Sequence, residues 1–200
     1  MATTGSNARG FVPTRRQDGS PPSPANRYAT GSNPTIIMLG DPVFLNANRK
    51  VQKYLAQHAS ANSPAVLGVV VGLLNSDGRP LTHAAEKKIG VSADGFIQVV
   101  DDPDCLFEIE CSASISPTTG VGNFATVVET ANTTANGRSG VKLAETNVVT
   151  AAGHPFQLYS LAPTELDRAG GPNNNWLVRI SNHVFRRSTR LQGPLEAADA

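Results

Sequence analysis

The densest group of side chains that could do chemistry lies at residues 101–104, where Asp101, Asp102 and Asp104 surround a proline. Two glutamates follow at positions 108 and 110. Carboxylate oxygens are the ligands that Ca²⁺ prefers, but the run lacks the Asp-x-Asp-x-Asp-Gly spacing of a calcium loop. Proline interrupts a β ladder, and short Asp side chains accept hydrogen bonds from nearby backbone N–H groups. The run therefore predicts a turn in preference to a metal site.

No other pattern assembles a catalytic site. The histidines stand singly, without the His-x-x-x-His spacing that places two imidazoles on one metal, at positions 58, 83, 154 and 183. Residues 120–122 lack the third glycine of a dinucleotide fingerprint, and residues 137–140 lack the Lys-Ser/Thr end of a phosphate loop. There is no Gly-x-Ser-x-Gly elbow. We therefore expect no enzyme, no cofactor and no metal, with a β-scaffold hydrolase as the catalytic alternative.

The two cysteines and the tryptophan are better explained by structural roles than by chemistry. Cys105 and Cys111 lie in one extended stretch, which puts their Cα atoms roughly 20 Å apart, too far for a disulfide. Two buried thiols in a reducing compartment are the simplest interpretation. Trp176 begins a run in which Trp176, Val178 and Ile180 share one face, so a core or subunit contact is favoured over a ligand platform.

Charge is sparse and unevenly placed. Charged residues make up 16% of the chain and the formal net charge is +1, so no basic field for nucleic acid is expected. Residues 1–34 carry four arginines and one acid, and residues 176–200 carry four arginines and two acids, which leaves a net charge of −4 between them. Basic ends on an acidic body suit docking on acidic neighbours, with solvated tails as the alternative.

Three segments follow from composition. Residues 1–34 are rich in proline and arginine and have almost no apolar periodicity, which predicts a long extended N-terminal arm that needs other polypeptides to become ordered. Residues 35–185 predict one mainly β domain, a small β-sandwich or a partly closed β-barrel. Residues 186–200 predict a basic, flexible C-terminal tail. No apolar run approaches the length of a membrane span, and the N-terminus has no secretory signal pattern, so synthesis in the cytoplasm is expected.

The β domain is predicted from short apolar runs between turn residues. The expected strands are 35–39, 43–45, 51–54, 66–74, 96–100, 106–111, 141–143, 156–161 and 176–180. The run at 66–74 is apolar almost throughout, which predicts a strand buried on both faces rather than a short buried helix. Along 106–111 the core face should hold Phe107, Ile109 and the two cysteines. Short helical turns are expected near 49–57, 83–88 and 121–129.

Several short motifs occur in a fixed order along the chain: residues 10–16 (GFVPTRR), 26–28 (NRY), 40–43 (GDPV), 66–72 (VLGVVVG), 99–104 (VVDDPD), 107–109 (FEI), 137–139 (GRS), 156–158 (FQL) and 176–183 (WLVRISNH). Taken together and in this order, they resemble a family of tailed-bacteriophage capsid decoration or cement proteins. The resemblance covers about residues 9–183.

The resemblance implies a structural virion protein that sits on the capsid exterior and stabilises the major capsid protein lattice. Its partners would be the major capsid protein and copies of itself, a trimer being favoured over a dimer, with no direct contact to nucleic acid or membrane. The expected capsid contacts are Phe11, Arg15, Arg16, Arg27, Tyr28, Arg186 and Arg187. A head-fibre or receptor-binding virion protein is the alternative within the same setting.

Overall fold

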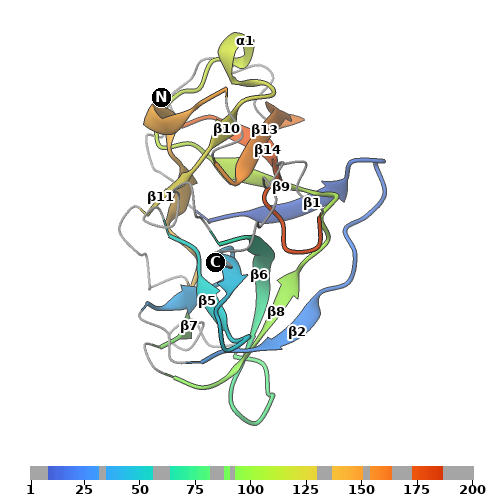
Figure 1. Cartoon of the computed structure of the whole chain (residues 1–200), viewed down its shortest axis with the longest axis vertical. Coiled ribbons are helices and arrows are strands. Elements are labelled where there is room, and N and C mark those ends of the chain that lie inside the picture. The colour runs from blue at the N-terminus through green and yellow to red at the C-terminus, as the bar shows by residue number, and fades with distance from the viewer. Residues whose placement is uncertain are drawn as a thin grey trace, which may run out of the picture.

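Two five-stranded antiparallel sheets form the body of the protein (Figure 1). The computed structural model describes residues 9–31, 35–55, 64–81, 88–90, 93–129, 137–150, 154–163 and 173–186. The upper sheet in Figure 1 has the order β1 (Val12–Arg16), β9 (Cys105–Glu110), β14 (Asn175–Ile180), β13 (Phe156–Leu161) and β10 (Phe124–Ala125). The lower sheet has the order β2 (Asn26–Ala29), β8 (Phe96–Val100), β6 (Val66–Leu74), β4 (Pro42–Leu45) and β5 (Val51–Lys53).

The described residues also form two short two-stranded ribbons: β3 (Ile37–Met38) with β7 (Lys88–Ile89), and β11 (Val127–Glu129) with β12 (Val141–Leu143). The predicted mainly β, sandwich-like fold is therefore confirmed. The sheets do not close into a barrel. Among the described residues, the edges of the lower sheet are bridged at one point, where Thr30, directly after β2, pairs in parallel with Val51 in β5.

Helix is confined, among the described residues, to the single turn α1 (Pro117–Gly120) and the 3₁₀ turn Glu145–Asn147. The predicted helical turns at 49–57 and 121–129 are wrong, because residues 51–53 form β5 and residues 124–129 contribute β10 and β11. β-branched residues at 126–128 favour the pleated backbone, and β13 and β12 supply partner strands. Of the third predicted turn, residues 83–87 lie outside the described residues.

Strand faces follow the sequence alternation. Cys105, Phe107, Ile109 and Cys111 are each at most 1% exposed and belong to the larger of two apolar clusters, together with Trp176. Both cysteines are free thiols, as predicted, and burial raises the pKa of Cys105 to about 12. These thiols are therefore poor nucleophiles at neutral pH.

Strand β6 is buried on both faces, as its continuous apolar sequence predicts. Val66 and Val69 join the larger cluster, which packs the two sheets together. Leu67, Val70 and Leu73 join the smaller cluster on the other side of the lower sheet. β6 lies at the centre of its sheet, between β8 and β4. The apolar run at residues 66–74 is therefore a strand, as predicted, and not a short buried helix.

The predicted N-terminal arm is not separate from the body. Residues 12–16 form the edge strand β1 against β9, and residues 26–29 form the edge strand β2 against β8. Phe11 is 1% exposed and lies inside the larger cluster. The segment is extended, as expected, but residues 9–31 pack on their own chain. An edge strand needs apolar side chains on one face only. One buried phenylalanine and a few ion pairs therefore suffice to hold a segment whose composition predicted that it could not pack by itself. Residues 1–8 lie outside the described residues.

The crossing of the N-terminal segment over residue 40 depends on glycine. Gly10 has φ +66°, and a Cβ there would lie 2.5 Å from the Gly40 carbonyl oxygen and 2.6 Å from Ser139 Cβ. Gly19 has φ +87° but open space around it.

We expect Gly19→Ala to lower the free energy of unfolding by about 1 kcal/mol through backbone strain alone. Gly10→Ala should cost about 2 kcal/mol more, because the crossing must move apart. Urea denaturation of both variants measures the difference, and equal losses would contradict the close crossing.

Candidate interaction surface

The acidic run at residues 101–104 forms a turn between β8 and β9 and contacts both the N-terminal segment at residues 16–28 and Arg186 of the C-terminal segment. Asp102 accepts hydrogen bonds from Ser23 Oγ at 2.6 Å and from the Asp104 backbone N–H at 2.9 Å, and it lies 2.9 Å from Arg16 Nε. Burial alone would raise the pKa of Asp102, but these donors and Arg16 hold it below its usual value. The predicted turn is confirmed, and its carboxylate is occupied by the protein's own donors.

The neighbouring carboxylates, Asp101 and Asp104, bind the same two segments. Asp101 accepts from Asn26 Nδ2 at 2.9 Å and from the Tyr28 hydroxyl, both on β2. Partial burial and this hydrogen bond raise the pKa of Tyr28. Asp104 lies 2.5 Å from Arg186 Nη2, which ties the C-terminal segment to the turn. We call β1, β2, the turn at 101–104 and residues 183–186 the terminal flank.

Three arginines of the basic terminal segments thus pair with acidic groups of their own chain. Arg9 lies 2.7 Å from Glu108 on β9, and Arg16 and Arg186 both reach the turn. The charge pattern alone indicated acidic neighbours for these arginines; among the described residues, those neighbours are supplied in the same chain. Part of the positive charge that was expected to bind a partner is therefore paired with carboxylates of the same chain.

Of the expected capsid contacts, only some remain available. Phe11 is in the core, so its assignment as a surface contact is wrong for the folded protein. Arg16, Tyr28 and Arg186 are half-buried and hydrogen-bonded or ion-paired at the turn. Arg15 and Arg27 are exposed, and Arg27 stacks on the Phe96 ring with its Cζ 3.7 Å from the ring centroid. Arg187 lies outside the described residues.

Phe185 is the contact candidate that the sequence reasoning missed. It is 58% exposed, and its neighbour Val184 is 36% exposed. The backbone N–H of Val184 donates to Val66 O, and the N–H of Phe185 donates to Nδ1 of His183, so hydrogen bonds position the backbone of the pair at the surface. An apolar pair in an otherwise polar C-terminal stretch was the available signal.

The interaction between Asp102 and the N-terminal segment should be measurable. The Asp102 side chain is 6% exposed, whereas that of Asp18, which also faces Arg16, is 61% exposed. Asp102→Ala removes the acceptor of Ser23 and the carboxylate nearest to Arg16, so we expect the free energy of unfolding to fall by about 2 kcal/mol. Asp18→Ala should cause a much smaller loss. Similar losses in urea titrations of the two variants would show that the turn does not anchor β1.

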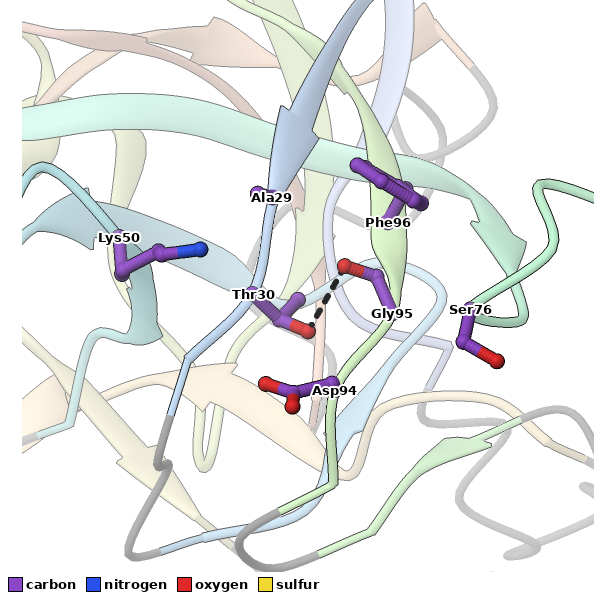
Figure 2. A pocket seen from close by; sticks show the side chains of 7 residues that line it. All are labelled: Ala29, Thr30, Lys50, Ser76, Asp94, Gly95 and Phe96. Atoms are coloured by element: carbon purple, nitrogen blue, oxygen red, sulfur yellow. Dashed lines mark hydrogen bonds between the residues drawn. The ribbon is translucent and has the colours of Figure 1, made fainter.

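A shallow cavity of about 200 Å³ lies at the Thr30 end of the lower sheet (Figure 2). It is lined by Ala29, Thr30, Lys50, Ser76, Asp94, Gly95 and Phe96. Thr30 Oγ1 donates to Gly95 O at 3.1 Å, a bond that joins the end of β2 to the start of β8. The lining brings together one cation and one anion from exposed loops, with no nucleophile and base in contact, and it suggests no reaction.

In the described part of the chain, no group of three His, Cys, Asp or Glu side chains is arranged to hold a metal ion. Within those same residues, no helix has the length and apolar character needed to cross a membrane. The chain matches no protein-family model, and no curated protein and no solved structure is significantly similar to it.

Proposed function

We propose that the protein is a structural virion protein of the cement or decoration type, which binds the outer surface of the major capsid protein lattice and stabilises it. The ordered series of motifs that resembles this family supports the proposal. Those motifs supply the framework of the fold, since they include β1, the start of β4, most of β6, the acidic turn and β14. Non-catalytic binding by a rigid surface is the activity that we assign.

The observation that carries the proposal is the terminal flank. Two edge strands, β1 and β2, lie on the right of Figure 1 and are joined by the acidic turn to the C-terminal segment. This flank presents the exposed cations Arg15 and Arg27 and the exposed ring of Phe185. Arginine and aromatic side chains are enriched at the energetic centres of protein interfaces. Because internal ion pairs already hold the flank in place, little conformational entropy is lost on docking.

Binding to particles tests the proposal. Purified protein is mixed with capsids that lack it, and co-sedimentation and the temperature of genome release are measured. We expect saturable binding and a raised release temperature. A triple variant, Arg15→Ala with Arg27→Ala and Phe185→Ala, should bind at least about tenfold more weakly, equivalent to about 1.4 kcal/mol. The matched control combines Arg49→Ala, Arg138→Ala and Val121→Ala, which removes two exposed cations and one exposed apolar side chain elsewhere.

The outcomes separate two claims. Absence of saturable binding by the wild-type protein would refute the cement function. Equal binding by wild type and the terminal-flank variant would refute this surface while leaving the cement function in place. Weak binding by the control variant as well would point to a general charge effect, which would also count against the terminal flank. Sedimentation of the free protein decides between the proposed trimer and a dimer.

A further inference from the structure

A lysine and two carboxylates meet inside the protein without a role in the terminal flank. The Lys53 side chain is fully buried, and its Nζ lies 3.1 Å from Asp41 Oδ1 and 2.5 Å from Glu129 Oε1. The Asp41 side chain is also fully buried, while that of Glu129 is 30% exposed. Ionised side chains are seldom buried this completely, because removing a charge from water costs more than one ion pair commonly returns.

Three separate segments build this site. Asp41 follows the Gly40 turn and immediately precedes β4, and Lys53 ends β5, which pairs with β4 so that Val43 lies opposite Lys53. Glu129 ends β11, far along the chain. The backbone N–H of Tyr54 donates to Pro42 O, which fixes the spacing between the residues next to Lys53 and Asp41. Regular sheet pairing therefore holds the amine against the acid.

The surroundings of Asp41 favour its uncharged form. Its Oδ2 accepts the Met38 backbone N–H at 2.7 Å, whereas Oδ1 is buried without a hydrogen bond of ordinary geometry despite lying near Lys53 Nζ. Burial raises the pKa of Asp41, although Lys53 and hydrogen bonds from Ser139 and Met38 oppose the shift. Proton transfer within a buried ammonium–carboxylate pair gives a neutral amine beside a neutral acid, which are the reactive forms of a nucleophile and an acyl acceptor.

We propose that Lys53 and Asp41 condense to form an intramolecular amide bond, with Glu129 as the catalytic proton carrier. The Lys53 nitrogen attacks Asp41 Cγ, and the Glu129 carboxylate, already in contact with that nitrogen, accepts its proton. Glu129 then returns the proton to the departing Asp41 hydroxyl, and the C–O bond breaks. The products are one Nζ–Cγ amide and one water molecule. No oxidant, metal or cofactor takes part.

The bond would join two neighbouring strands at their buried ends. It would convert a costly buried ion pair into a neutral amide and close a covalent loop from residue 41 to residue 53, which restricts the unfolded chain. The proposal is independent of the cement function, since it concerns only the protein's own core.

Mass spectrometry of the denatured full-length protein provides the test. The intact mass should lie below the sequence mass by one water molecule. Trypsin cleaves after Arg27, Arg49 and Lys50 but not after an amidated Lys53, so the bond would release residues 28–49 joined to residues 51–87. Without the bond, residues 28–49 and 51–53 appear as separate peptides. Fragmentation of the joined species distinguishes the amide from dehydration within one peptide.

Variants identify the roles of the three residues. Lys53→Met and Asp41→Ala should have their full sequence mass, and Glu129→Gln should form the bond more slowly or not at all while remaining folded by circular dichroism. The buried pair Lys142 and Glu110, 2.9 Å apart, is an internal control, because among the described residues it has no second carboxylate in contact. Folded wild-type protein with its full mass and separate peptides after prolonged incubation would overturn the proposal. Unchanged bond formation in Glu129→Gln would overturn the role of Glu129.

Discussion

Replacing Phe11 by alanine is expected to lower the free energy of unfolding by about 3–5 kcal/mol, the usual cost of removing a fully buried ring. Phe11 is 1% exposed and packs with ring centroids 4.7 Å from Phe156 and 6.3 Å from Phe107, the latter edge to face. Its backbone N–H donates to Gly40 O at 2.9 Å. It is the apolar anchor that attaches the N-terminal segment to both the upper sheet and the start of the lower one.

Phe185→Ala is the matched control, since it removes the same ring from a position that is 58% exposed. Its effect on stability in urea should be close to zero. Deletion of residues 1–31 should prevent folding, because it removes β1, β2 and the anchor together. A Phe11→Ala variant as stable as Phe185→Ala, or a stably folded deletion variant, would restore the view of this segment as a detachable arm.

The second large effect is a loss of stability in mild acid that depends on His183. Its side chain is buried, with Nδ1 accepting the Phe185 N–H and Nε2 without a hydrogen bond among the described residues. Burial lowers the pKa of His183 from 6.5 to about 4, with Arg186 acting in the same direction and Asp101 and Asp102 opposing it. The neutral form is therefore the one that the fold accommodates.

The sign of the effect follows from proton linkage. As the pH falls from 6.5 to about 4, the unfolded chain binds a proton that the folded protein does not. The free energy of unfolding should therefore fall through this interval by up to about 3 kcal/mol, and the stability is regained as the pH rises again. His183→Asn keeps an acceptor for the Phe185 N–H but cannot titrate, so its stability should be flatter over the same interval.

Urea titrations at several pH values between 4.5 and 7 measure this difference. Contributions from other groups are common to both proteins and cancel when the two curves are subtracted. His154 is the other described histidine whose pKa burial lowers, and His154→Asn gives its separate share. Parallel curves for wild type and His183→Asn would show that His183 is protonated in the folded protein at no cost.

Local pattern predicted most of the strands and their faces. The expected strands at 96–100, 141–143 and 156–161 match β8, β12 and β13, and 66–74 matches β6. Alternation of apolar and polar residues predicts the buried face because successive side chains in a strand point to opposite faces. The sequence of a strand therefore indicates which of its faces is buried. The free, buried cysteines and the acidic turn followed from similarly local rules.

Composition misled where long-range pairing decides the structure. Residues 9–31 have few apolar side chains, but β9 and β8 supply backbone partners, the core accepts Phe11, and the acidic turn pairs with Arg16. Residues 124–129 lack strict alternation, and they form the strands β10 and β11 because β13 and β12 pair with them.

The sequence by itself determined a mainly β chain, the strand faces and the absence of any recognised catalytic motif, because these depend on neighbours in the chain. Only the tertiary structure decided that Arg16 and Arg186 bind the protein's own acidic turn and that Asp41 and the partly exposed Glu129 both contact the buried Lys53. Contacts between residues distant in sequence depend on which strands pair and in which register. The sequence of one strand does not indicate which other strand pairs with it.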